Sequence, residues 1–237
     1  MTDMTDADSV RGRAPATGGA FYRLVWKWHF LASLYVLPFM VLLGLTGGLY
    51  LYKPQIERWL YADMLVVEAQ AERLPLETQL AGFETVAAPS RIREVQVAED
   101  PAASVRIEYD DPEGTRAYGY VDPYTGEVLG LMARDGMFMR QVQKLHGEIL
   151  LGDVGTKFVE LAAHWAVVMF VTGAVLWWPR KSGIGARKKL IVTPEGTGRT
   201  WWRTTHMFTG MLATVLVVPI LITGLPWTDI WGGGLDR

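Results

Sequence analysis

Residues 30–52 read FLASLYVLPFMVLLGLTGGLYLY and contain no charged side chain. At a rise of about 1.5 Å per residue, a helix of this length crosses a hydrocarbon core of about 30 Å. Two later stretches have the same character, LAAHWAVVMFVTGAVLWW at 161–178 and MFTGMLATVLVVPILITGLPW at 207–227. The sequence therefore predicts an integral membrane α-helical protein with three transmembrane helices. With their interfacial turns, the helices are placed at residues 24–53, 156–178 and 202–227.

Tryptophans and basic residues near these stretches predict how the chain is oriented. Tryptophans flank all three spans, as in the aromatic belts of membrane proteins, and Lys and Arg gather before the first span and between the second and third. The positive-inside rule predicts that residues 1–20, a disordered tail, and residues 179–201, a basic loop, lie in the cytoplasm. Residues 57–135 then form a domain outside the cytoplasm, and the C-terminus also lies outside. The residues concerned are Trp26, Trp28, Trp177, Trp178, Trp201, Trp202 and Trp227, and Arg11, Arg13, Arg23, Lys27, Arg180, Lys181, Arg187, Lys188, Lys189, Arg199 and Arg203.

A cleaved signal peptide is the competing interpretation of residues 30–52. Such a peptide has an apolar core of about 7–15 residues and a small-residue cleavage site of the A-x-A type. The apolar stretch here is longer, and the GGLYLYKP at its end contains no such site. We interpret the stretch as a membrane anchor.

The composition limits the chemistry that the chain can perform. It contains no cysteine, which excludes disulfides, iron–sulfur clusters, thiol catalysis and the C-x-x-C-H attachment of a c-type haem. The sequence also lacks a Gly-rich dinucleotide fingerprint and an H-E-x-x-H zinc motif. The three apolar stretches contain none of the carboxylates that a proton pump would bury, and Glu160 and Asp229 lie only at their edges. Redox chemistry would therefore need a bound cofactor.

Between the first two spans the sequence predicts a small α+β domain. Pro75 and Glu77 are typical of a short helix start. The runs IREVQVAE at 92–99 and ASVRIEYD at 103–110 alternate apolar and polar residues, as in a β-hairpin, and RAYGYVDPYTGEVLG (116–130) contains two more strands. The acids of this region are interpreted as a solvated face rather than a metal site. They are Glu94, Glu99, Asp100, Glu108, Asp110 and Asp111.

The segment MFMRQVQKLHGEILLGDVG joins this domain to the second span. Its pattern predicts an amphipathic periplasmic helix at 137–150, followed by a turn at Gly152 to Gly155. A helical hairpin of this kind would fold His146 back toward the second span.

The chain has four histidines, and all lie in or beside a predicted span: His29, His146, His164 and His206. An ionisable side chain inside a span is costly, so His164 is a functional candidate by default. His29 and His206 are followed 17 and 18 residues later by Thr46–Gly47 and Thr223–Gly224, a short internal repeat. Eighteen residues make about five helical turns, so histidine and glycine share a helix face. Taken singly, each histidine also fits an interfacial or hydrogen-bonded packing role, and the glycines fit close helix packing.

Depth along the helices groups the histidines into two layers. His29 and His206 lie three or four residues inside the cytoplasmic tryptophans, roughly 5 Å deep at helical rise. His164 lies about 21 Å from the cytoplasmic end of its span, and His146 can join that layer if the hairpin forms. Neutral imidazoles can fill both axial positions of haem iron. Two such pairs would hold two non-covalent b-type haems and form an electron path across the bilayer.

The motifs, in their order along the chain, resemble the PepSY-associated transmembrane proteins of bacteria. The matching pieces are WHF with LTGGLYLYKP, VDPYTGEVLG, LHGEILLGDVG, ELAAHW with TGAVLWWPR, RTTHMFTG and LITGLPW, which cover nearly the whole chain after residue 20. The resemblance implies that residues 57–135 form a PepSY-like domain. Members characterised as ferric-siderophore reductases carry two b-type haems, which implies that all four histidines are axial ligands of haem iron. Typical members continue past GLPW, so a short member and a piece of a longer protein both fit.

The resemblance further implies an oxidoreductase of the bacterial inner membrane, multi-pass and with a cytoplasmic N-terminus. Electrons would enter from a cytoplasmic flavin- or NAD(P)H-dependent donor and reduce a ferric siderophore in the periplasm. The iron would then be released, because Fe(II) binds hard oxygen chelators more weakly than Fe(III). Membrane lipid is the remaining expected partner, and nucleic acid is not expected.

Two other functions compete with electron transfer. A haem-free membrane anchor could use its PepSY-like domain to bind peptide or to regulate a partner protease, but it would give the four membrane histidines no role. A transporter accessory protein would need a polar pathway through the spans, which the sequence lacks. Four side chains could face substrate or haem propionates, although surface and packing roles are favoured for them: Tyr118, Tyr120, Arg134 and Arg140.

Overall fold

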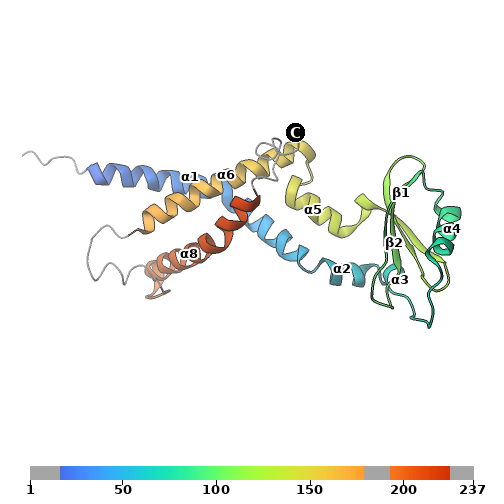
Figure 1. The fold of residues 1–237 in the computed structure, drawn as a ribbon. Coiled ribbons are helices and arrows are strands. Elements are labelled where there is room, and N and C mark those ends of the chain that lie inside the picture. Colours follow the sequence, from blue (N-terminus) through green and yellow to red (C-terminus); the bar gives the residue numbers. More distant parts are fainter. Residues whose placement is uncertain (1–16, 179–192, 225–237) are drawn as a thin grey trace, which may run out of the picture. The chain divides into compact units, whose positions relative to one another are not determined.

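A computed structural model describes residues 17–178 and 193–224 of the chain. The chain divides into two compact units, Met1–Phe39 with Glu160–Arg237, and Met40–Val159. We call the first the helical unit and the second the sheet unit (Figure 1). Most of the predicted 1–20 tail, most of the 179–201 loop with its basic residues, and Trp227 lie outside the described residues.

Among the described residues, three helices are long and apolar enough to cross a membrane. They are α1 (Thr17–Tyr50), α6 (Gly152–Trp177) and α8 (Gly198–Gly224), in agreement with the three predicted spans. Helix α1 begins at Thr17, so residues 17–20 are helical rather than part of the predicted tail. The apolar residues at 21, 24, 25 and 28 have helical spacing, which extends the helix back beyond the uncharged stretch.

Most apolar side chains of these helices point away from the protein. In the most apolar 18-residue stretch of each helix, the share of buried residues is 17% in α1, 22% in α6 and 0% in α8. Leu34 and Leu45 of α1 are 68% and 69% exposed. Exposed apolar surface on this scale requires a solvent other than water. The helices therefore contact membrane lipid.

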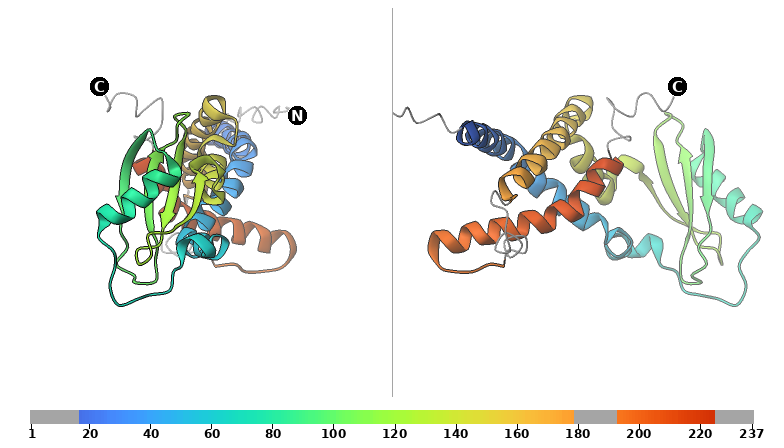
Figure 2. Two further views of the ribbon diagram at one scale, coloured as in Figure 1. Left: turned by 90° about the vertical axis from the view of Figure 1, so that its right-hand side faces the viewer. Right: turned by 60° about the vertical axis from the view of Figure 1, so that its left-hand side comes forward.

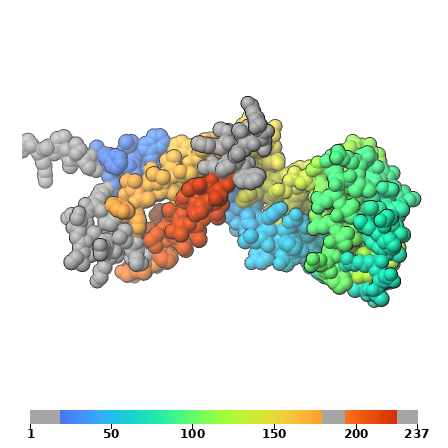
Figure 3. All heavy atoms as spheres, viewed as in Figure 1, coloured from blue at the N-terminus to red at the C-terminus, as the bar shows by residue number. Residues whose placement is uncertain are grey.

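Within the helical unit, α1 packs against α6 (Figure 3). The rings of Trp28 and Trp165 stack with their centroids 5.8 Å apart. Ala32 on α1 and Ala162 and Ala166 on α6 are buried. Small side chains of this kind let membrane helices approach closely.

The sheet unit contains one antiparallel sheet in the order β1-β2-β3-β4. Its strands are β1 (Arg91–Gln96), β2 (Val105–Asp110), β3 (Arg116–Val121) and β4 (Val128–Ala133). Strand β1 pairs with β2 in the predicted hairpin, with Val95 opposite Ile107. The two strands predicted within residues 116–130 are β3 and β4, so the sequence prediction of four strands is confirmed.

Helix α4 (Leu76–Ala87) covers one face of this sheet (Figure 2). Phe83, Ile107 and Val121 are wholly buried between helix and sheet. The Phe83 ring meets the Tyr109 ring edge-on, with centroids 5.1 Å apart, a favourable aromatic geometry. Gly119 makes room for that ring, because a Cβ there would lie 2.2 Å from Phe83 Cε2.

The remaining elements of the sheet unit are α2 (Lys53–Leu60), α3 (Ala62–Leu65), the 3₁₀ helix η1 (Arg134–Gly136) and α5 (Phe138–Glu148). Met64 of α3 lies over Gly130 of β4. The backbone N–H of Phe138, at the start of α5, donates to Tyr61 Oη at 2.9 Å. These contacts fix where α5 begins.

The turn after α5 lies earlier than predicted. Helix α5 ends at Glu148, and Ile149 and Leu150 adopt positive φ of 44° and 61°. Helix α6 already begins at Gly152, so the predicted turn at Gly152 to Gly155 is wrong. Gly155 instead allows the backbone of α6 to approach the backbone of Glu148 closely, because a Cβ there would lie 1.6 Å from Glu148 O.

Candidate functional site

The four predicted haem ligands are divided between the two units. His29 on α1, His164 on α6 and His206 on α8 belong to the helical unit, and His146 on α5 belongs to the sheet unit. The structure brings His29 and His206 together. His146 and His164 lie in different units, and their pairing stays a prediction.

Helix α6 holds the ring of His29 through its Nδ1 atom. This nitrogen lies 3.0 Å from Met169 O and 3.2 Å from Thr172 Oγ1. A carbonyl oxygen can only accept a hydrogen bond, so Nδ1 carries the hydrogen and Nε2 keeps its lone pair. A Cβ at Gly173 would lie 3.1 Å from His29 Cε1, so the glycine leaves room for the ring.

The rings of His29 and His206 have centroids 6.2 Å apart and are nearly perpendicular, at 81°. A metal–imidazole nitrogen bond of about 2 Å, the length found for zinc, places the centres of two opposed axial imidazoles about 6 Å apart. The observed separation fits two axial ligands of one iron. His206 is otherwise exposed.

His164 has its Nδ1 fixed within its own helix. The atom lies 2.7 Å from the carbonyl oxygen of Glu160, one turn earlier. As with His29, the carbonyl oxygen can only accept, so the hydrogen is on Nδ1. Glu160 was expected only at the edge of the span, yet it is 2% exposed.

His146 of α5 binds the last turns of α1. Its Nδ1 lies 2.9 Å from Oγ1 of Thr46, which is 6% exposed. The Thr46 hydroxyl donates to Leu42 O at 2.8 Å, so its oxygen is left to accept from the imidazole. A Cβ at Gly47 would lie 3.4 Å from His146 Cε1. Withdrawal from water lowers the pKa of His146, which favours the neutral ring that binds metals.

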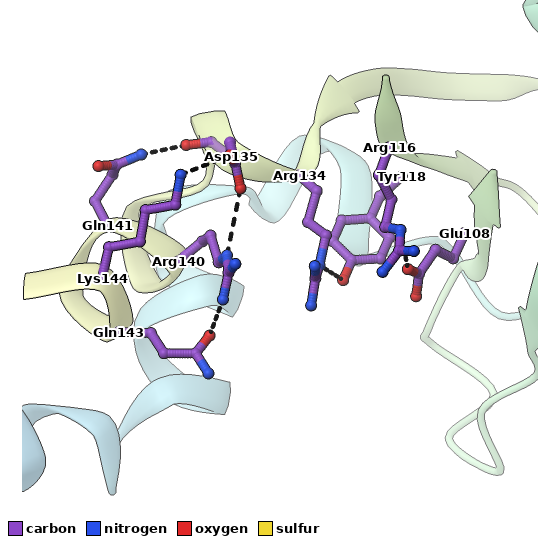
Figure 4. A network of polar contacts seen from close by, with 9 residues as sticks. All are labelled: Glu108, Arg116, Tyr118, Arg134, Asp135, Arg140, Gln141, Gln143 and Lys144. Atoms are coloured by element: carbon purple, nitrogen blue, oxygen red, sulfur yellow. Dashed lines mark hydrogen bonds and ion pairs between the residues drawn. The ribbon is translucent and has the colours of Figure 1, made fainter. Parts of the chain in front are cut away.

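A polar network anchors the start of α5 (Figure 4). The Asp135 carboxylate accepts from Lys144 Nζ at 2.5 Å and from Arg140 Nε at 3.3 Å. The Asp135 carbonyl accepts from the Gln141 amide. Lys144 and Arg140 hold the pKa of Asp135 below its usual range. The network fixes the helix that carries His146.

The aromatic and basic residues proposed to face substrate have mixed positions. Tyr120 is 1% exposed, and burial raises its pKa to about 12, so it is a packing residue. Tyr118 accepts from Arg134 Nε at 3.2 Å and lies under the Arg106 guanidinium, 5.0 Å from the ring centroid. Arg140 belongs to the network at α5.

Several of the predicted surface acids form ion pairs with arginine. Asp110 accepts from Arg93 Nε at 2.7 Å, and Asp100 accepts from Arg58 at 3.2 Å. The Arg93 guanidinium holds the pKa of Asp110 below its usual range. Within the described ranges, 17–178 and 193–224, no group of three acidic or histidine side chains could hold a metal ion.

Sequence reasoning did not find the residues that hold the histidines. Thr172 and Met169 were not singled out, and Thr46–Gly47 was linked only to His29 of its own helix. The signal that could have found them is the recurrence of Thr followed by Gly inside the spans. The histidine that each of these Thr–Gly pairs contacts comes from a different helix.

The fold and these side chains define a multi-pass membrane protein with three apolar helices and a small four-stranded antiparallel sheet. Residues 26–237 match the model of the family described as the PepSY-associated TM region, PepSY_TM. The chain belongs to this family, and the resemblance drawn from its motifs is confirmed. No curated protein matches the chain in a sequence comparison.

Proposed function

We propose that this protein is a di-haem b electron-transfer protein of the bacterial inner membrane. It passes electrons from a cytoplasmic flavin- or NAD(P)H-dependent donor to a periplasmic ferric siderophore, and one electron converts each Fe(III) to Fe(II). The observation that carries the proposal is the pair His29 and His206, whose centroids lie 6.2 Å apart inside a membrane protein. The basic residues beside the first and third spans support a cytoplasmic N-terminus and a periplasmic sheet unit.

The four histidines would hold two b-type haems. His29 and His146 each have Nδ1 within hydrogen-bond distance of an oxygen, which leaves Nε2 for a metal, and His164 has its Nδ1 on the Glu160 carbonyl. In this proposal the four histidines would hold two haems, the first of them between His29 and His206. When bound, haem iron would supply the reversible one-electron chemistry.

The protein contributes ligation, orientation and exclusion of water. Met169 O and the Thr172 hydroxyl fix the plane of the His29 ring before any metal binds. The helices α1, α6 and α8 are apolar enough to span a membrane, and in such surroundings a neutral imidazole is favoured over a charged one.

The first experiment measures haem directly. The protein is expressed with ample haem, purified in mild detergent, and its visible spectrum and pyridine haemochromogen are recorded before and after dithionite. We expect a low-spin b-type spectrum and about two haems per chain. His29→Ala and His164→Ala should each remove one haem, and Thr214→Val, which changes a span residue bonded only within α8, serves as the matched control.

A second measurement tests the acceptor. The dithionite-reduced protein is mixed with a ferric siderophore and a chelator that colours only with Fe(II). Reoxidation of the haem spectrum together with Fe(II) capture supports reduction. A folded but colourless protein contradicts electron transfer and leaves the haem-free PepSY anchor, which binds peptide or regulates a protease, as the better function.

A further inference from the structure

The same threonine–glycine pair contacts a histidine at two separate places in the chain. Each time, one helix presents a backbone carbonyl, a threonine hydroxyl three residues later and a glycine directly after it. On α6 all three groups meet His29, and on α1 the threonine and the glycine meet His146. The positions are 169, 172 and 173 on α6, and 43, 46 and 47 on α1.

Helix geometry explains why these groups act together. Positions i, i+3 and i+4 lie on one face of a helix, within a single turn. Each threonine donates its only hydrogen to the carbonyl four residues earlier, at 2.7 Å for Thr172 and 2.8 Å for Thr46. The oxygen can then only accept from the imidazole. The glycine leaves the space in which the ring lies.

We propose that this Thr–Gly step is a histidine seat, in which Thr172–Gly173 positions His29 and Thr46–Gly47 positions His146. The seat holds the hydrogen on Nδ1 and fixes the ring plane, so that Nε2 is presented to the metal. The identification of this metal as haem iron rests on the proposed function. The seat itself consists only of protein groups and exists without haem.

The first test uses the haem-free protein. The chain has only four histidines, so selective ¹³C,¹⁵N-histidine labelling gives an NMR spectrum that single His→Gln variants can assign. We expect His29 and His146 to carry their hydrogen on Nδ1, whereas imidazole in water prefers Nε2–H. Gly173→Ala should displace the His29 resonances, and Gly44→Ala, where a Cβ meets nothing within 4 Å, should not. Hydrogen on Nε2 of both rings would overturn the seat.

The second test uses the haem-loaded protein. Outer-shell partners of a metal-bound histidine typically change affinity by about tenfold or more. Thr172→Val and Thr46→Val should therefore lose haem to apomyoglobin about tenfold faster, with a changed low-spin EPR signal. Thr→Ser at either position keeps the hydroxyl and should restore both properties, and Thr214→Val should leave them unchanged.

The two tests separate the seat from the proposed function. Valine variants that keep the wild-type haem loss rate and EPR signal would overturn the seat, while the haem proposal stands. A chain that binds no haem would contradict the proposed function, and the NMR result in the haem-free protein would still decide whether the seat exists.

Discussion

The sheet unit and the helical unit use apolar side chains in opposite ways. In the sheet unit, Phe83 and Ile107 are wholly buried, so removal of apolar area from water stabilises the fold. In the helical unit, Leu216 of α8 is 58% exposed, and its solvent is lipid. Polar groups differ as well, because a membrane helix must satisfy them internally, as Thr172 does with Val168 O. Stability is therefore read from the apolar contacts around the sheet, and the candidate site from the polar contacts that the apolar helices make with histidines.

The largest expected effect comes from the core of the sheet unit. Phe83→Ala should destabilise this unit by about 3–5 kcal/mol, because a large ring is lost and a cavity remains. Hydrogen exchange of the full chain, followed by mass spectrometry, should show faster exchange in β2 and β3. The matched control is Leu216→Ala, which removes a lipid-facing side chain and should leave α8 protected. Equal effects of the two changes would contradict the contrast.

A lysine substitution should have the opposite pattern, with a large effect in α8 and a small one on the surface of the sheet unit. Leu216→Lys places an ammonium group in the middle of α8 and should cost about 2.5–3.5 kcal/mol of insertion free energy. Val86→Lys changes a residue of α4 that is 60% exposed and should stay within about 0.5 kcal/mol. The amount of protein that resists alkaline extraction from membranes measures insertion. Comparable loss in both variants would argue that α8 does not face lipid.

Sequence patterns were sufficient for the elements of both units. Uncharged length located the three helices, and alternation located the hairpin in which Val95 pairs with Ile107. The predicted turn at Gly152 to Gly155 is wrong because it rests on glycine as a helix breaker. The structure uses Gly155 for close backbone contact with Glu148 inside the first turn of α6. Glycine signals both outcomes, and only the packing distinguishes them.

The candidate site was predicted only in part. Equal depth along the helices indicated that His29 and His206 would meet, and their rings do. In the sequence, the Thr–Gly pairs at Thr46–Gly47 and Thr223–Gly224 indicate a relation to the histidine of their own helix. The partner of Thr46 is His146, one hundred residues later. A hydrogen bond between distant helices leaves no periodic trace in the sequence, so tertiary packing decides it.

The smallest expected effect concerns the anchor of α5. The Lys144 and Arg140 side chains hold the pKa of Asp135 below its usual range. A carboxyl group with a lowered folded-state pKa contributes stability that is complete above its unfolded pKa, near 4, and is lost as the pH falls through the folded value. The anchor should therefore be constant from about pH 5 to 8 and weaken below about pH 4.

Asp135→Asn should produce at neutral pH the weakening that acid produces in the wild type. Exposed ion pairs contribute about 0.2–1 kcal/mol each, so the change is small and confined to the start of α5. Hydrogen exchange, corrected for the intrinsic rate at each pH, measures it in the α5 amides, and Glu113→Gln in the turn between β2 and β3 is the control. An α5 that exchanges equally in both variants would mean that Tyr61 and the buried Met139 hold the helix without the ion pairs. The orientation of His146 would then depend on packing alone.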